Sequence, residues 1–290
     1  MKILRKIGQI ILTFLPFMVT MGLQVIMTIP VTFYYFLIVM STQNIPGDIN
    51  AMLDWMMTEM LYGDYGVIVT ICWGIASLIT FIFWYRKQRN KKDIVPLKQS
   101  VNIYSIGGLS LMVAGLQISI QYLYTYIEIL YPEWFVEYNE LMNLGHYSMP
   151  AVIAMYIYSV IIAPIHEEFL IRGVTQNFAK KAFPFWLANI VQAAIFGVLH
   201  MNIIQGSYAF LVGLFIGYVM HKAKNIWIPI LFHFFFNLFG TIVPLKLLGE
   251  NADSAYVLVI AIGIAILSAG IVLFEFTINN RDIALGIKES

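Results

Sequence analysis

Long runs of apolar residues, rather than short alternating patterns, organise this chain. A helix that crosses a bilayer needs about 20 mostly apolar residues. Eight candidate runs lie at about 9–40, 66–85, 103–130, 149–171, 184–201, 206–221, 226–247 and 255–277. The pattern therefore predicts an all-α polytopic membrane protein with eight transmembrane helices. The first and third runs exceed the length that a span needs, and the sixth is short.

Composition agrees with this interpretation. The chain is 60% hydrophobic and only 11% charged, whereas soluble domains carry about 25% charged residues. Its single cysteine, Cys72, excludes an intramolecular disulfide and a cysteine-based metal site. The first apolar run extends well beyond a signal-peptide core of roughly 7–15 residues, so we expect it to remain as the first span.

The connections between the runs alternate in charge. Basic residues gather before the first run, at 86–98, at 172–183, at 222–225 and in the C-terminal tail. The acidic connections at 41–65 and 131–148 contain no Lys or Arg. Because basic connections stay on the cytoplasmic side, this alternation predicts a cell-membrane protein with both termini in the cytoplasm. It also favours counting 206–221 as a span. The basic connections are expected to touch anionic lipid, and no nucleic-acid partner is expected.

Polar residues that are energetically unfavourable inside a membrane span concentrate in the second half of the chain. They are Glu167, Glu168 and Arg172 in the fourth run, Gln192 and His200 in the fifth, and His233 and Asn237 in the seventh. Ionisable residues inside a span usually face a protein interior or a water-filled cavity and are usually functional. We therefore expect an active-site cavity built from helices 4, 5 and 7.

Helical spacing separates the roles of the three charged residues. Glu168 and Arg172 stand four apart, so they can pair on one helix face and support the structure. Glu167 is rotated by about 100° from Glu168, which leaves it the freer carboxylate. Partial burial would make Glu167 a better general base near neutral pH. The alternative is that all three residues form one buried ionic lock. His166 is expected to be structural or modulating.

Two hydrolytic schemes use the same residues. In the metal-free scheme Glu167 draws a proton from water, His200 helps to hold that water, and His233 with Asn237 stabilises the oxyanion. In the metal scheme Glu167, His200 and His233 would hold zinc. The zincin pattern itself is absent, because the residue four after His166 is Leu170 rather than a second histidine. The sequence leaves both schemes open.

Three motifs in order carry a family resemblance. Glu167-Glu168-x-x-x-Arg172, Phe196-x-x-x-His200 and His233-x-x-x-Asn237, flanked by Ala163-Pro164-Ile165 and by Gly173, resemble the CAAX-protease and bacteriocin-processing (CPBP, or Abi) enzymes. The resemblance covers about 145–245. It implies an intramembrane endopeptidase, often labelled a metalloprotease, that acts on a peptide or protein. Catalysis would use Glu167, His200, His233 and Asn237, and bacterial members include bacteriocin self-immunity proteins.

The same observations suggest a division of the chain. We expect three N-terminal transmembrane helices with their loops in 1–144, the catalytic core in 145–247, and a last helix with a cytoplasmic tail in 248–290. A non-enzymatic scaffold or immunity protein that keeps the fold is the first alternative. A proton-coupled carrier is the second, although the inverted repeats typical of carriers are not evident in the sequence.

Overall fold

The computed structural model describes residues 2–42, 48–90, 94–242 and 253–287. Within these ranges the chain is helical and contains no strand. The first half comprises α1 (Lys2–Thr42), α2 (Ile49–Tyr62), α3 (Asp64–Gln88), α4 (Leu97–Ser100), α5 (Ile103–Leu130), η2 (Pro132–Phe135), α6 (Val136–Leu141) and η3 (Leu144–His146). The second half comprises α7 (Met149–Ile157), η4 (Tyr158–Ile162), α8 (Ala163–Glu168), η5 (Phe169–Thr175), α9 (Gln176–Ala182), α10 (Phe185–Leu199), α11 (Ile203–Ala223), α12 (Trp227–Ile242) and α13 (Asp253–Leu285).

The helical membrane fold predicted from the apolar runs is confirmed, whereas the number of spans is confirmed only in part. Six helical stretches in the described ranges are long and apolar enough to cross a membrane: Leu4–Ile38, Asp64–Gln88, Ile103–Leu130, Met149–Ala182, Ile203–Ala223 and Ser254–Leu285. The run at 206–221 is one of them. The other two predicted spans are the shorter apolar helices Phe185–Leu199 and Trp227–Ile242, so eight complete spans remain a prediction.

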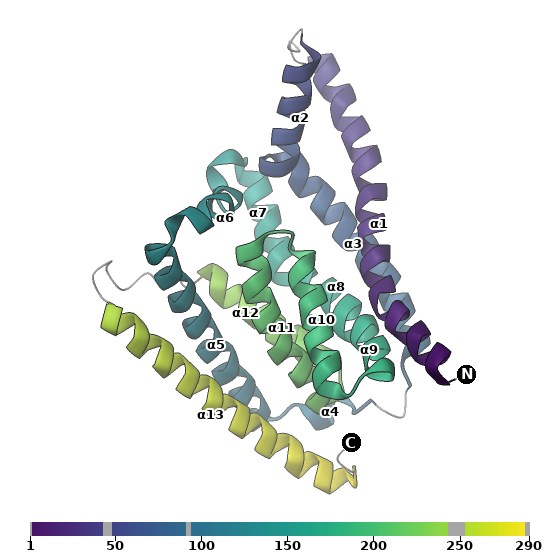
Figure 1. The fold of residues 1–290 in the computed structure, drawn as a ribbon, viewed down its shortest axis with the longest axis vertical. Helices are drawn as coiled ribbons and strands as arrows, with labels where there is room; N and C mark the ends of the chain where they lie inside the picture. The colour runs from purple at the N-terminus through teal and green to yellow at the C-terminus, as the bar shows by residue number, and fades with distance from the viewer. Residues whose placement is uncertain (1, 43–47, 91–93, 243–252, 288–290) are drawn as a thin grey trace.

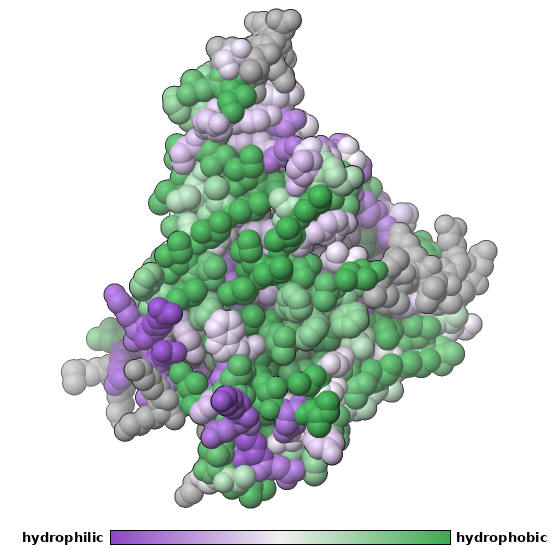
Figure 2. All heavy atoms as spheres, turned by 180° about the vertical axis from the view of Figure 1, so that it is seen from behind, coloured by the Kyte–Doolittle hydropathy of each residue, from purple (hydrophilic) through white to green (hydrophobic). Residues whose placement is uncertain are grey.

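The short helices α10 and α12 lie in the middle of the molecule, surrounded by longer ones (Figure 1). On one side α1 and α3 run together towards α2, and on the other α13 lies along α5. Exposed apolar side chains cover the outside, and hydrophilic residues gather at the end of the molecule away from α2 (Figure 2). This distribution is that of a membrane protein whose polar groups are kept inside the bundle or at its end.

The α5–α13 pair depends on glycine. A Cβ atom on Gly115 of α5 would lie 2.5 Å from the carbonyl oxygen of Gly263 and 2.3 Å from the backbone nitrogen of Leu267, both on α13. Small residues let helix backbones approach closely in a membrane, where van der Waals packing supplies much of the association energy. The last helix is therefore fixed against a helix from the first half of the chain.

The helix that carries the two glutamates departs from α geometry twice. It runs through Met149–Ala182, but Tyr158–Ile162 and Phe169–Thr175 are wound as π-helix. The hydroxyl of Thr175 donates to the carbonyl oxygen of Leu170, five residues earlier, at 2.9 Å. π-turns inside α-helices are frequent at functional sites. Here they bracket α8, the single α-helical segment that ends in Glu167 and Glu168.

Candidate active site

The predicted pairing of Glu168 with Arg172 is present. Nη1 of Arg172 donates to Oε1 of Glu168 at 2.8 Å, and both side chains are fully buried. Nη2 of Arg172 donates to the carbonyl oxygen of Gly213 on α11 at 3.0 Å, while the guanidinium lies 4.8 Å from the ring centre of Phe196 on α10. Arg172 thus joins its own helix to α10 and α11.

Glu168 also orients a histidine. Nδ1 of His233, on α12, lies 2.8 Å from the same Oε1 atom that Arg172 contacts. An ionised carboxylate can only accept a hydrogen bond, so Nδ1 carries the proton and donates it. The Nε2 atom of a neutral His233 is then left with a lone pair. The spacing of Glu168 and Arg172 indicated a structural pair, but the additional bond to His233 could not be inferred from spacing within one helix.

Glu167 lies beside the free nitrogen of His233. Oε2 of Glu167 is 3.7 Å from Nε2 of His233, and its side chain is 17% exposed whereas that of Glu168 is fully buried. A separation above about 3.5 Å is too long for a direct hydrogen bond, and a water molecule can bridge such a pair. The two adjacent glutamates are therefore in different environments: Glu168 is buried and hydrogen-bonded, whereas Glu167 is partly exposed.

His166 forms the other side of the Glu167 environment. Its side chain is completely buried, with Nε2 2.9 Å from the hydroxyl of Tyr158 and 3.9 Å from Oε1 of Glu167. The ring of Trp73 on α3 packs edge-on against it at 5.3 Å. The sequence analysis did not identify Tyr158 or Trp73. The only available signal was that Tyr158 lies about two helical turns before His166.

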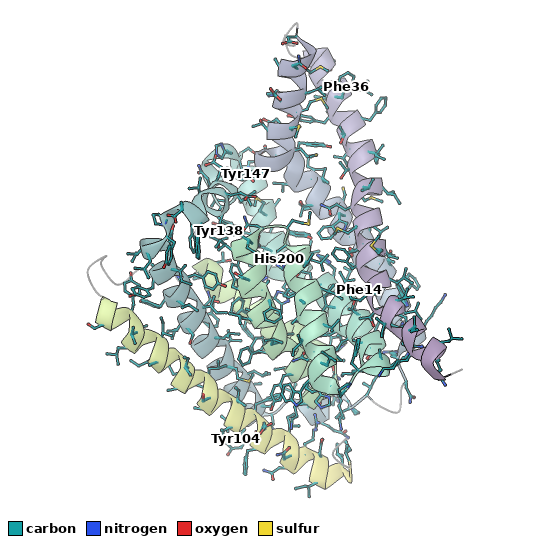
Figure 3. All side chains as sticks on the ribbon, viewed as in Figure 1. Phe14, Phe36, Tyr104, Tyr138, Tyr147 and His200 are labelled. Atoms are coloured by element: carbon teal, nitrogen blue, oxygen red, sulfur yellow. The ribbon has the colours of Figure 1, made fainter. Side chains whose placement is uncertain are left out.

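Phe196 connects the two predicted catalytic histidines. Its ring makes edge-to-face contacts with His200, at 4.9 Å, and with His233, at 5.7 Å. Nδ1 of His200 lies 2.9 Å from the carbonyl oxygen of Phe196, so Nδ1 is the donor and Nε2 is free to accept. Figure 3 labels His200 in the interior, at the end of α10. No hydrogen bond or ion pair between described residues joins His200 to Glu167.

Asn237 has a backbone partner. Its Nδ2 donates to the carbonyl oxygen of Ser159 at 2.7 Å. In the π-turn the N–H of Ala163 bonds to Tyr158, and the next residue, Pro164, has no N–H to offer Ser159. Asn237 therefore satisfies a carbonyl that proline leaves without a helical partner, and this contact brings α12 against the glutamate-bearing helix. One N–H of the amide remains for another acceptor.

A second polar layer lies towards the other end of the same helices. The side-chain amides of Gln176, Asn189 and Gln192 donate to the carbonyl oxygens of Gly217, Leu214 and Gly213 on α11, at 3.1, 2.9 and 3.0 Å respectively. All three side chains are buried. The sequence analysis noted Gln192 but missed Asn189, three residues earlier in the same run, and Gln176. These amides fix α9, α10 and α11 together.

The expected zinc ligands are not assembled as a metal site. Histidines that donate from Nδ1 to a carboxylate or carbonyl and keep Nε2 free resemble metal ligands in their chemistry. However, no group of three or more His, Cys, Asp or Glu side chains in residues 2–42, 48–90, 94–242 and 253–287 could hold a metal ion. Glu167, His200 and His233 thus do not form such a group in this arrangement, the metal scheme stays an untested prediction, and no step below is routed through a metal.

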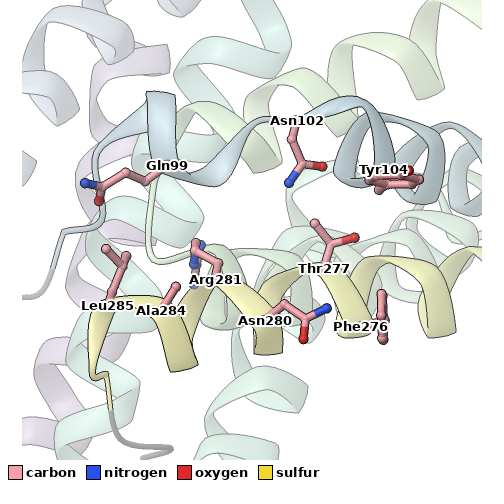
Figure 4. Close-up of a pocket in the computed structure, with 9 residues that line it drawn as sticks. All are labelled: Gln99, Asn102, Tyr104, Phe276, Thr277, Asn280, Arg281, Ala284 and Leu285. Carbon is pink, nitrogen blue, oxygen red and sulfur yellow. The ribbon is translucent and has the colours of Figure 1, made fainter.

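Two further cavities lie away from the motif residues. One, of about 480 Å³, is bordered by Gln99, Asn102 and Tyr104 on one side and by the end of α13 on the other (Figure 4). The other has a volume of about 770 Å³ and is lined by the ends of α3, α9 and α11. Neither reaches Glu167 or His233.

Comparison with known proteins confirms the resemblance that the motifs predicted. Residues 149–239 match the family described as type II CAAX prenyl endopeptidase Rce1-like. The matched segment contains Glu167, Glu168, Arg172, His200, His233 and Asn237. The chain is thus a multi-pass helical membrane protein in which residues 149–239 are similar to this family.

Individual relatives are distant. The chain is 29% identical over 96 residues to a Bacillus subtilis (strain 168) protein named "Putative membrane peptidase YdiL", and 29% identical over 91 residues to an Escherichia coli protein named "Uncharacterized 24.3 kDa protein". These alignments cover 33% and 30% of this chain. They span about two-fifths of the relatives, 39% and 42% of their lengths. No solved structure matches.

Proposed function

We propose that the protein is an intramembrane endopeptidase that hydrolyses a peptide bond in a membrane-associated protein or peptide. The observation that carries this proposal is the difference between the two adjacent glutamates. Glu168 is buried and bonded to Arg172 and His233, whereas Glu167 is partly exposed beside the free nitrogen of His233. A carboxylate with this freedom is suited to accept a proton from water.

In the proposed reaction Glu167 accepts the proton of a water molecule, and the resulting hydroxide attacks the carbonyl carbon of the substrate. Nε2 of His200, whose Nδ1 is engaged by Phe196, accepts the second hydrogen bond from the water. The proton taken by Glu167 passes to the leaving amide nitrogen as the carbon–nitrogen bond breaks. Water is the only co-reactant, and the products are a carboxylate and an amine.

The developing oxyanion needs hydrogen-bond donors. Asn237 offers the N–H that Ser159 does not use. His233 offers Nε2–H when its imidazole is protonated, and the carboxylate of Glu168 at Nδ1 stabilises that charge. A carboxylate that orients a histidine and stabilises its positive charge recurs in unrelated hydrolases. Donors already fixed by the fold stabilise such charge at little reorganisation cost.

The proposal extends to topology. We propose that the two short helices complete eight spans and that both termini lie in the cytoplasm, because the basic connections alternate with acidic ones. The catalytic core would then occupy 145–247, with 1–144 and 248–290 as flanking transmembrane parts.

The test is peptidomics of the membrane and secreted fractions from cells that carry wild type, Glu167→Gln or Glu137→Gln. Glu137 is an exposed glutamate outside the site and serves as the matched control. We expect one or more peptides to disappear with Glu167→Gln and to persist with Glu137→Gln. A cellular function that survives Glu167→Gln with an unchanged peptide profile would contradict the peptidase and favour a scaffold.

A further inference from the structure

The larger of the two outlying cavities is strongly basic. It has a volume of about 770 Å³, within the range of small-molecule sites, and its lining includes Arg89, Lys180, Lys181 and Lys224. No Asp or Glu occurs among the described residues that line it. Lys180 and Lys181 lie in α9, whereas Arg89 directly follows α3 and Lys224 directly follows α11.

These cations are poorly neutralised. Nζ of Lys180 and of Lys181 lie over the rings of Phe185 and Phe178, at 5.7 and 5.2 Å. In the described ranges neither lysine has a carboxylate partner, and one carboxylate, Asp282, lies 3.7 Å from Nζ of Lys224. Like charges gathered in a partly buried cavity repel one another, so a counter-anion would be stabilising there.

The wall of the cavity is fixed by one backbone–backbone and one side chain–backbone hydrogen bond. The N–H of Val95 donates to the carbonyl oxygen of Lys224 at 3.1 Å, and Nδ2 of Asn225 donates to the carbonyl oxygen of Val95 at 2.8 Å. Lys224 has a φ of +55°, in the left-handed region that favours glycine. This is the left-handed C-cap of α11, where the N–H of Lys224 donates to the carbonyl oxygen of Met220 at 3.1 Å, so the cap fixes the position of the lysine at the edge of the cavity.

We propose that this cavity binds a phosphate-bearing anion, with Arg89, Lys180, Lys181 and Lys224 as its cationic contacts. Arginine contacts phosphate bidentately and lysine as a point charge. The headgroup of an anionic phospholipid is favoured over a soluble phosphate, because Tyr85, Ile94 and Leu285 add apolar surface to the lining. Basic pockets between transmembrane helices bind such headgroups.

The smaller cavity does not offer an equivalent anion-binding site. Arg281 is the one cation among the described residues that line it. It already donates to the carbonyl oxygens of Ala223 and Lys222, each at 3.0 Å, and pairs with Asp282 at 2.6 Å. A cation with this many partners has little left to offer a ligand.

The test measures binding of phosphatidylglycerol, phosphatidylcholine and inorganic phosphate to the purified full-length chain by native mass spectrometry. The test variant is Lys180→Gln with Lys181→Gln. The matched control is Lys87→Gln with Lys98→Gln, two exposed lysines that do not line the cavity. We expect the test variant to lose phosphatidylglycerol affinity by about 25-fold, roughly fivefold per cation, and the control to change little.

A second variant distinguishes loss of the binding site from misfolding of the protein. Lys224→Gly removes a cation where glycine suits the backbone better, so it should weaken phosphatidylglycerol binding about fivefold without lowering the melting temperature. Competition by inorganic phosphate at millimolar levels would support the site with a soluble phosphate as its ligand. Equal losses in the test and control doubles, or equal binding of phosphatidylcholine and phosphatidylglycerol, would overturn the proposal.

Discussion

One carboxylate oxygen of Glu168 receives both Nη1 of Arg172 and Nδ1 of His233, each at 2.8 Å. The arginine holds three helices together, and the histidine reaches towards Glu167. A single buried atom therefore serves the structure and orients a group proposed to be catalytic. Substitutions at the two neighbouring glutamates should consequently have different effects.

Glu167→Gln should strongly lower the peptidase activity with little effect on stability. The side chain is partly exposed, and its nearest imidazole nitrogens lie at 3.7 and 3.9 Å. Loss of a general base typically lowers the rate by about 10² to 10⁴-fold. Turnover of a substrate found by peptidomics and the melting temperature measure the two effects. Substantial remaining turnover would contradict the role of Glu167 as the base.

Glu168→Gln should lower both activity and stability. It leaves the fully buried Arg172 without its counter-charge and removes the carboxylate that orients His233. Breaking one partner of a buried ion pair costs about 3–5 kcal/mol. Thermal unfolding in detergent should therefore separate Glu168→Gln clearly from Glu167→Gln. Equal stability of the two variants would show that the Glu168–Arg172 pair does not support the fold.

Asn237→Ala should destabilise the protein by about 1–3 kcal/mol, because the carbonyl oxygen of Ser159 then has no donor. Adding Pro164→Ala supplies a backbone N–H at the position where the proline lacks one. We expect the double variant to recover stability but not peptidase activity, since the donor proposed for the oxyanion stays absent. Recovery of both would assign Asn237 a structural role alone.

Tyr158→Phe tests the support of His166. The change removes the hydroxyl 2.9 Å from Nε2 of a completely buried imidazole, at a cost of about 1 kcal/mol. Because His166 borders Glu167, we expect a lower kcat with an unchanged KM. Tyr156→Phe, at a residue that is 42% exposed, is the matched control and should behave as wild type. A change in KM alone would argue against positioning of the base.

Activity should persist after treatment with a chelator. The carboxylate and the two imidazoles proposed as zinc ligands are not assembled around a common point in the described structure, and the proposed steps use side chains alone. Turnover is compared before and after chelation, together with the metal content of the active protein. Loss of activity that stoichiometric zinc restores would show that the three residues rearrange to hold the ion.

The sequence predicted the helical membrane fold and the Glu168–Arg172 contact because both depend on local patterns. Hydropathy marked the six long helices, and the i, i+4 spacing marked the ion pair. The last part of the predicted run 226–247, after Ile242, lies outside the described residues. Hydropathy did not reveal α2, which lies in an acidic connection.

The contacts between helices could not be predicted from the sequence. The bonds from His233 to Glu168 and from Asn237 to Ser159 depend on how α12 packs. Pro164 marks a break in helical hydrogen bonding beside the first π-turn, but the local pattern does not specify that either turn is a π-turn. Tyr158 was overlooked for this reason, as a tyrosine in an apolar run is usually a packing residue.

The pairing of α5 with α13 has a consequence for biosynthesis. The glycine-lined face of α5 receives its partner only when the last helix has been made, long after the segment with the glutamates has left the ribosome. Until then that face must remain against lipid or the insertion machinery. Nascent chains that stop before Asp253 should therefore be incomplete bundles and preferred substrates for membrane quality control, even though every residue proposed for catalysis is already present.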